Sequence, residues 1–180
     1  MATAAATVHV DQATHERFIR RAIALAGQAV EKGNQPFGAL LVRHEAKESV
    51  VVLEAENEVH TCHDVTMHAE QNLISQASRK LTREQFSNLY LYTSTEPCCM
   101  CAGATYWSGG VSHVVYACSE QKLGEICSRS KDAITRSIGM DIPCRDVFAR
   151  AHKRPDGSPA VHVIGPILEE EAAAQHVKFW

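Results

Sequence analysis

Apolar residues follow helical spacing in the first part of the chain. Between residues 11 and 32 they recur at every third or fourth position, and Gly33 follows the last of them. Glycine commonly ends a helix because it adopts backbone conformations that other residues avoid. We therefore predict a helix over residues 11–32. Its apolar positions are Phe18, Ile19, Ala22, Ile23, Ala26 and Val30.

Short apolar runs predict strands in the remainder of the chain. The first two form a hairpin around the polar segment His44–Glu48, since a polar turn between two apolar runs is typical of this connection. The predicted strands are Phe37–Val42, Ser49–Leu53, Leu89–Thr93, Val111–Tyr116 and Val161–Ile164. Helical patterns separate most of them, and the further predicted helices cover about 66–79, 98–108 and Ile167–Lys178.

This alternation of helices and buried strands predicts an α/β protein, arranged as a three-layer α/β/α sandwich around a mixed sheet of about five strands. A chain of 180 residues is of ordinary length for one domain and can bury a substantial core. It contains no repeat, low-complexity run or linker, and Arg154–Pro159 indicates a turn. We therefore expect residues 1–180 to form a single domain.

Composition and charge narrow the function. Hydrophobic residues make up 45% of the chain and charged residues 22%, which is ordinary for a globular protein. The formal net charge is −3, and no basic cluster is longer than Lys153-Arg154. A nucleic-acid partner normally requires a concentrated basic face, so this balance disfavours one.

The cysteines indicate a reducing compartment. Met1–Val10 lacks the cationic start and apolar run of a secretory leader, and no segment is apolar enough to span a membrane. An odd count of seven cysteines, two of them in a metal-type motif, does not suggest a disulfide framework. We expect a cytoplasmic protein. The other cysteines are expected to be small buried residues or free thiols, and they are Cys62, Cys99, Cys118, Cys127 and Cys144.

Two short motifs carry the candidate chemistry. His68-Ala69-Glu70 supplies a histidine and a carboxylate, and Pro97 precedes Cys98 and Cys101. Three zinc-type ligands leave the fourth position of a tetrahedral zinc open to water, which is typical of a catalytic site. Together these motifs match the signature of the zinc deaminases.

Local structure explains the spacing of these motifs. Cys98 and Cys101 are one helical turn apart, so both sulfurs can face one point at a helix start, where the helix dipole favours thiolates. The other motif also lies near a predicted helix start, with Asp64 or Thr66 as the expected cap. Zinc lowers the pKa of a bound water toward ~7. Glu70 can then carry the proton to a ring nitrogen and on to a leaving amine, which is hydrolytic deamination.

A structural zinc site is the alternative, and it requires a fourth protein ligand. His60, Cys62 and His63 are close enough in sequence to supply one. A non-catalytic, zinc-stabilised interaction module is therefore an alternative to an enzyme. Glu70 favours the enzyme, because an inactive module has no use for a carboxylate at that position.

The sequence resembles the cytidine deaminase-like superfamily, in the branch that holds guanine deaminases, fungal-type cytosine deaminases and tRNA adenosine deaminases. The matching segments are Pro36-Phe37-Gly38-Ala39, Asn57, His68-Ala69-Glu70, Thr95-Glu96-Pro97-Cys98, Met100-Cys101-Ala102-Gly103-Ala104 and Tyr106-Trp107. The resemblance thins beyond about residue 117. It implies zinc held by His68, Cys98 and Cys101, with Glu70 as the catalytic residue.

The resemblance also implies substrate contacts. Phe37 and Trp107 resemble aromatic residues that wall a flat purine in guanine deaminases, although either could serve only the core. The Asn57 amide could pair with a base edge or cap a turn, and the Ala69 backbone N–H could bond a ring carbonyl. Glu96 and Asp132 are further carboxylates that a purine could meet.

The function predicted from these features is hydrolytic deamination of a free nucleobase or nucleoside, with guanine to xanthine plus ammonia as the leading reaction. The alternatives are cytosine, cytidine or another amino-heterocycle, then adenosine in tRNA. The terminal helix begins with three glutamates and ends with Phe179 and Trp180. Since exposed terminal aromatics waste apolar surface, we expect them to close a pocket, in a homodimer. Simple packing of this helix on its own domain is the alternative.

Overall fold

The computed structural model describes residues 9–137 and 139–180; residues 1–8, on which the expectation of no leader partly rests, lie outside the described part. The strands are β1 (Gly38–His44), β2 (Ser49–Glu56), β3 (Leu89–Thr95), β4 (Val111–Cys118) and β5 (His162–Ile164). The helices are α1 (Gln12–Glu31), α2 (Val59–Cys62), α3 (Ala69–Lys80), α4 (Cys99–Ser108), α5 (Glu120–Cys127), α6 (Ala133–Ser137), α7 (Cys144–Ala149) and α8 (Glu169–Phe179).

The described strands form one mixed sheet in the order β2-β1-β3-β4-β5. β1 pairs antiparallel with both β2 and β3, whereas β3, β4 and β5 run parallel. Every residue of β3 is buried, as expected for a central strand covered on both faces. The predicted hairpin, the mixed sheet and its five strands are therefore confirmed.

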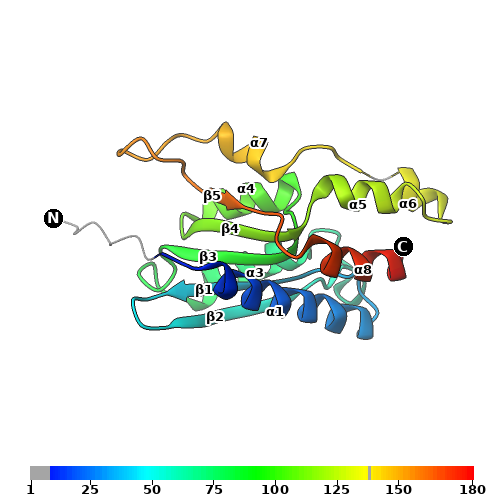
Figure 1. Cartoon of the computed structure of the whole chain (residues 1–180), viewed down its shortest axis with the longest axis horizontal. Helices are drawn as coiled ribbons and strands as arrows, with labels where there is room; N and C mark the ends of the chain where they lie inside the picture. Colours follow the sequence, from blue (N-terminus) through cyan, green and yellow to red (C-terminus); the bar gives the residue numbers. More distant parts are fainter. Residues whose placement is uncertain (1–8, 138) are drawn as a thin grey trace.

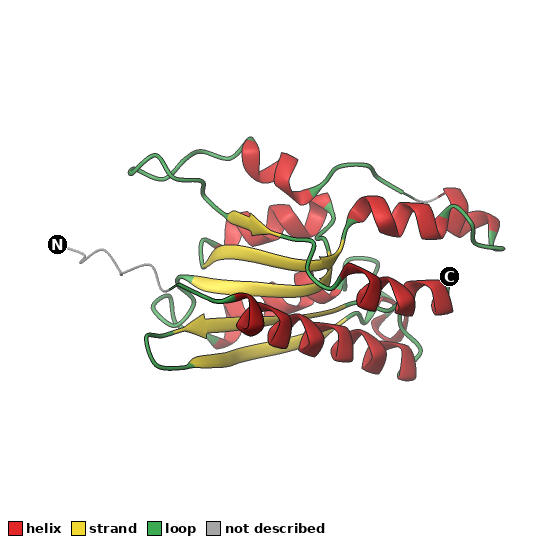
Figure 2. Cartoon of the chain, in the orientation of Figure 1, coloured by secondary structure: helices red, strands yellow, loops and turns green. Residues whose placement is uncertain are grey.

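Helices cover both faces of the sheet, which completes the predicted three layers (Figures 1 and 2). On one face, α1 and α8 pack against alternate residues of the strands such as Leu40 and Tyr92. On the other face, α3, α4 and α7 pack against the intervening residues such as Leu41 and Leu91. Successive strand residues thus enter different cores, because side chains alternate across a strand.

The first helix fixes the start of β1. Asp11 caps α1 by accepting a 2.8 Å hydrogen bond from the Thr14 backbone N–H. Gly38 begins β1 so close to α1 that an added Cβ would lie 2.5 Å from the Ala26 backbone nitrogen. Only glycine fits this approach without a shift of the backbone. The Pro-Phe-Gly segment is therefore held at a set distance from α1, and Phe37 with it.

Candidate active site

The three predicted metal ligands meet where α3 and α4 begin. One ligand atom from each of His68, Cys98 and Cys101 lies within 4.8 Å of the other two, and Cys98 Sγ is 3.6 Å from His68 Nδ1. Zinc bonds of about 2.0 Å to nitrogen and 2.3 Å to sulfur fit a cluster of this size. No fourth His, Cys, Asp or Glu joins this cluster among the described residues. The donor set thus fits a zinc site with an open fourth position.

In both α3 and α4 a metal ligand occupies the N-cap position. The predicted caps Asp64 and Thr66 are wrong, because α3 begins at Ala69 and His68 is its N-cap residue, in extended conformation. Asp64 instead accepts hydrogen bonds from Thr66, its backbone N–H at 2.8 Å and its hydroxyl at 2.7 Å, in a turn before the helix. Cys98 is likewise the N-cap residue of α4. Two helix N-termini therefore meet at the metal ligands, and their dipoles favour thiolates there.

A hydrogen bond between the two cysteines shifts their pKa values in opposite directions. The Cys101 thiol and then His68 hydrogen-bond to Cys98 and lower its pKa to about 4, although burial opposes this shift. The pKa of Cys101 is raised, because its proton is held in the bond to Cys98 and because it is buried. Cys98 is thus a thiolate at neutral pH. Deprotonated sulfur is the form that binds zinc.

Glu70 lies in the first turn of α3 and is only 4% exposed. Its Oε1 accepts a 2.6 Å hydrogen bond from the Thr93 hydroxyl on β3. Burial raises the pKa of Glu70, although the bond from Thr93 opposes the rise. A carboxyl group held beside the ligands, with a raised pKa, is suited to accept and return a proton.

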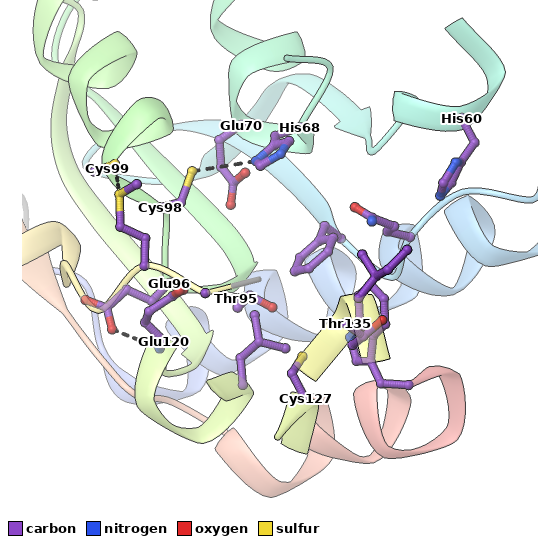
Figure 3. A pocket seen from close by; sticks show the side chains of 17 residues that line it. His60, His68, Glu70, Thr95, Glu96, Cys98, Cys99, Glu120, Cys127 and Thr135 are labelled. Atoms are coloured by element: carbon purple, nitrogen blue, oxygen red, sulfur yellow. Dashed lines mark hydrogen bonds between the residues drawn. The ribbon is translucent and has the colours of Figure 1, made fainter. Parts of the chain in front are cut away.

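A cavity of about 590 Å³ opens beside these residues (Figure 3). Pockets of about 300–1,000 Å³ are typical of small-molecule sites. The cavity is lined by Gln35, Phe37, His60, His68, Glu70, Thr95, Glu96, Cys98, Cys99, Glu120, Leu123, Cys127, Ile134, Thr135, Gly139, Met140 and Trp180. The lining thus combines the ligands His68 and Cys98 and the buried carboxylate of Glu70 with side chains from the segment after β4.

Of the predicted substrate residues Phe37, Asn57 and Ala69, only Phe37 lines the cavity formed by the described residues. Phe37 lines the cavity, with its ring 5.2 Å from that of His176. Ala69 is fully buried at the first position of α3. Asn57 is 1% exposed and its Oδ1 accepts from the Val59 N–H at 3.2 Å, so it makes a turn contact. Its Nδ2 has no partner among the described residues, although Asn57 is not among those lining the cavity.

The structure does not bring Trp107 to the pocket. Its side chain is 83% exposed near the end of α4, and it is absent from the cavity lining of the described residues. The expectation of a Trp107 wall came from the motif in which it lies. Trp107 is eight residues after the first helical position, on a helix whose first turn holds Cys101. It therefore lies two helical turns away from the metal ligands.

Much of the cavity wall was not identified from the sequence. The segment after β4 contributes Glu120, Leu123, Ile134 and Met140, and this region departs from recognisable patterns. The carboxylate of Glu120 is half-buried, and burial followed by the nearby Cys98 raises its pKa to about 7. Trp180 lines the pocket of its own chain, which agrees with the expected role of the terminal aromatics. The indole Nε1 of Trp180 is buried and has no partner among the described residues.

Comparison with known proteins decides the family. The zinc-binding region of cytidine and deoxycytidylate deaminases matches residues 12–118. The chain belongs to this family. The match includes all three ligands and Glu70, and it ends where the resemblance in the sequence thins. The structural-zinc alternative loses its support, because this deaminase brings no fourth ligand to the cluster among its described residues.

Individual relatives of this deaminase differ in substrate. A probable cytosine deaminase of Schizosaccharomyces pombe is 33% identical over 91% of this chain and 90% of its own. Guanine deaminase of Bacillus subtilis is 43% identical over 52% of this chain and 58% of its own. The structure of guanine deaminase from Nitrosomonas europaea has a TM-score of 0.69 at 19% identity, covering 99% of this chain and 98% of that one, which establishes the fold alone.

Two broader expectations can be compared with the described residues. None of their helices is both long and apolar enough to cross a membrane. All seven cysteines are free of disulfides, which agrees with the expected small buried residues and free thiols. Cys118 and Cys144 are buried, whereas Cys62 is exposed.

Proposed function

We propose that this deaminase converts guanine to xanthine and ammonia, and that residues 1–180 act as a single catalytic domain. The observation that carries the proposal is the position of Glu70, buried beside three zinc-type ligands at one end of a cavity large enough for a purine. An inactive interaction module would not require this carboxylate. Its fixed contact with Thr93 also argues for a precise task.

Each residue has a definite task in the proposed reaction. His68, Cys98 and Cys101 would hold the zinc ion, which supplies Lewis-acid activation of water when it is bound. Glu70 takes one proton from the attacking water and passes it to a ring nitrogen. It then takes the second proton from the new hydroxyl on the substrate carbon and gives it to the amino group, so that the C–N bond breaks as the C=O bond forms and ammonia leaves. Phe37 and Trp180 flank the flat ring. The Ala69 N–H and the Asn57 Nδ2, which lie behind the cavity lining, are the proposed donors to its polar edge, and they require the ring to reach past that lining.

Guanine is preferred to cytosine for two reasons. The most similar segment among the relatives described above belongs to a guanine deaminase. The cavity of about 590 Å³ also exceeds the needs of a single pyrimidine ring. Cytosine is the second candidate, because the relative matched over 91% of the chain is a probable cytosine deaminase.

The charge of the cavity favours a substrate without phosphate. Glu70, Glu96 and Glu120 all line it, and no lysine or arginine does so in the described part of the chain. A phosphate would face carboxylates with no lysine or arginine side chain to pair with, and like charges repel strongly where water is partly excluded. Free bases and nucleosides therefore suit this site better than nucleotides or RNA.

We also propose that the enzyme is a cytoplasmic homodimer. Free cysteines throughout the chain suit a reducing compartment. Exposed apolar residues on α4, including Trp107, offer surface that a second subunit could cover. Light scattering at working concentration tests the assembly, and a monomer would contradict the dimer.

An ammonia-release screen tests the substrate. Guanine, guanosine, cytosine, cytidine, adenine and aminotriazines are supplied separately to the zinc-loaded protein. We expect guanine to give the highest kcat/KM. A clear preference for cytosine would move the enzyme to the second candidate, and turnover of tRNA adenosine without free-base activity would overturn the proposal.

A further inference from the structure

Glu96 connects the segment that carries the ligand Cys98 to the segment after β4 that lines the cavity. The cavity-lining part of that second segment is called the outer wall below. It follows β3 and is two residues before the ligand Cys98, and its side chain is 5% exposed. Its Oε2 accepts a 3.2 Å hydrogen bond from the Glu120 backbone N–H (Figure 3), and its Oε1 accepts a 3.1 Å bond from the Cys144 N–H. Its own N–H donates to the Cys118 carbonyl at 2.7 Å. Glu96 thus contacts the chain at three points beyond β3.

The two backbone donors are the ends of one segment. Glu120 is the first residue of α5, and Cys144 is the first residue of α7. Between them the chain contributes the outer wall of the cavity. The wall residues in this segment are Glu120, Leu123, Cys127, Ile134, Thr135, Gly139 and Met140. A single carboxylate therefore bonds both ends of this segment. It acts together with the Ser119–Glu169 hydrogen bond next to α5 and with the burial of Cys144 in the core.

The form of the contact explains why a glutamate is required. The first N–H groups of a helix have no partner within the helix, and a carboxylate is the acceptor that such groups favour most. Its two oxygens can satisfy one donor on each helix at the same time. A glutamine offers only one oxygen, so its NH₂ group would face the second N–H and leave that donor unpaired.

We propose that Glu96 is a positioning residue that holds both ends of residues 120–144 and so sets the substrate-binding wall against the metal site. The effect on substrate binding rests on the proposed function, whereas the ordering of the segment does not. Glu96 acts on binding through the wall and leaves the proton transfer by Glu70 in place.

Glu96→Gln is the first test, and Glu125→Gln is its matched control because Glu125 is an exposed carboxylate on α5. Hydrogen exchange should become at least about tenfold faster for amides in residues 120–144 of Glu96→Gln. KM for the substrate found by the screen should rise about tenfold or more, with a much smaller change in kcat. Zinc content should be unchanged. The control should match the wild type in all three measurements.

Cys144 allows the same contact to be removed from its other side. Proline is tolerated at the first position of a helix, and Pro143 before it is extended at φ −56° and ψ 144°, as a following proline requires. Cys144→Pro deletes the N–H that Glu96 accepts, whereas Cys144→Ala keeps it and removes only the sulfur. We expect Cys144→Pro to show faster amide hydrogen exchange across residues 120–144 and a higher KM than Cys144→Ala.

The outcomes separate this proposal from the proposed function. The positioning role would be overturned if Glu96→Gln matched the wild type in hydrogen exchange and KM. The same holds if Cys144→Pro matched Cys144→Ala in both measurements. A fall in kcat at constant KM and exchange would also overturn it, since Glu96 would then act in the chemistry. If Glu96→Gln does not fold, the Cys144 pair decides. If the screen finds no substrate, the proposed function fails, and hydrogen exchange alone still tests the positioning role.

Discussion

Replacement of Glu70 by glutamine removes the proposed proton carrier with little change in shape. The glutamine Oε1 can still accept the bond from Thr93 that the carboxylate accepts at 2.6 Å. The variant should therefore keep its fold and its zinc. Since burial raises the pKa of Glu70, exchange for a neutral amide should leave the melting temperature equal or higher.

The size of the catalytic loss follows from the role of Glu70. General acid–base catalysis by a positioned group contributes ~10²–10⁴-fold. At about 1.36 kcal/mol for each tenfold, this loss of rate corresponds to about 2.7–5.4 kcal/mol of transition-state stabilisation. We expect kcat to fall by at least about 10²-fold in Glu70→Gln, because Glu70 is proposed to act in more than one proton transfer.

Ammonia release under saturating substrate measures kcat, and metal analysis accompanies it. Thr93→Val is the control, because it keeps the carboxylate but removes the hydrogen bond that fixes it. Its loss should be smaller, about tenfold. Full activity in Glu70→Gln would refute the mechanism. Loss of zinc from that variant would show instead that Glu70 is a metal ligand.

Three further predictions concern binding, charge and acid stability. Trp180→Ala should raise KM about tenfold, ~1.4 kcal/mol, because the ring lines the cavity, whereas exposed Trp107→Ala should leave KM unchanged; equal effects in steady-state kinetics would contradict this. Guanosine monophosphate should inhibit guanine turnover at least about tenfold more weakly than guanosine, and equal inhibition constants would show that the carboxylates do not repel phosphate. Burial lowers the pKa of His44 and His113 to about 4. Since each ionises near 6.5 when unfolded, stability should be full above about pH 7 and fall between 6.5 and 4. In the variant that combines His44→Gln and His113→Gln, the melting temperature should fall less between pH 6.5 and 4 than in the wild type. An equal fall in both proteins would refute this prediction.

The sequence predicted the layers well because each of the longer strands contains a run of apolar residues. Leu40 and Leu41 are both apolar because they enter different cores, and β3 is buried throughout. Strands covered on both faces therefore appear in the sequence as apolar runs. The start of α3 was predicted less well. Asp64 is a good cap by residue type, but its side chain already bonds Thr66 in a turn, and the helix begins at the metal ligand His68.

The metal site was predictable because its ligands lie in two short motifs of recognisable spacing, whereas the cavity wall was not predictable. Cys98 and Cys101 are one helical turn apart, and His68 lies beside Glu70, so the spacing itself carries the chemistry. The wall depends on long-range contacts such as that between Glu96 and Cys144, which are 48 residues apart. No periodicity reports such a contact. For Trp107 the motif suggested a place beside the substrate, but its position near the end of α4 leaves the side chain exposed.

The most direct measurement of the central claim is zinc-dependent ammonia release from guanine. The protein is stripped with a chelator, dialysed, and assayed before and after addition of one equivalent of zinc, with xanthine and ammonia both quantified. The account predicts no turnover by the stripped protein, and restored turnover with equal amounts of xanthine and ammonia after zinc is added. Ammonia release that persists in the stripped protein, or zinc-loaded protein that leaves guanine unchanged, would contradict it.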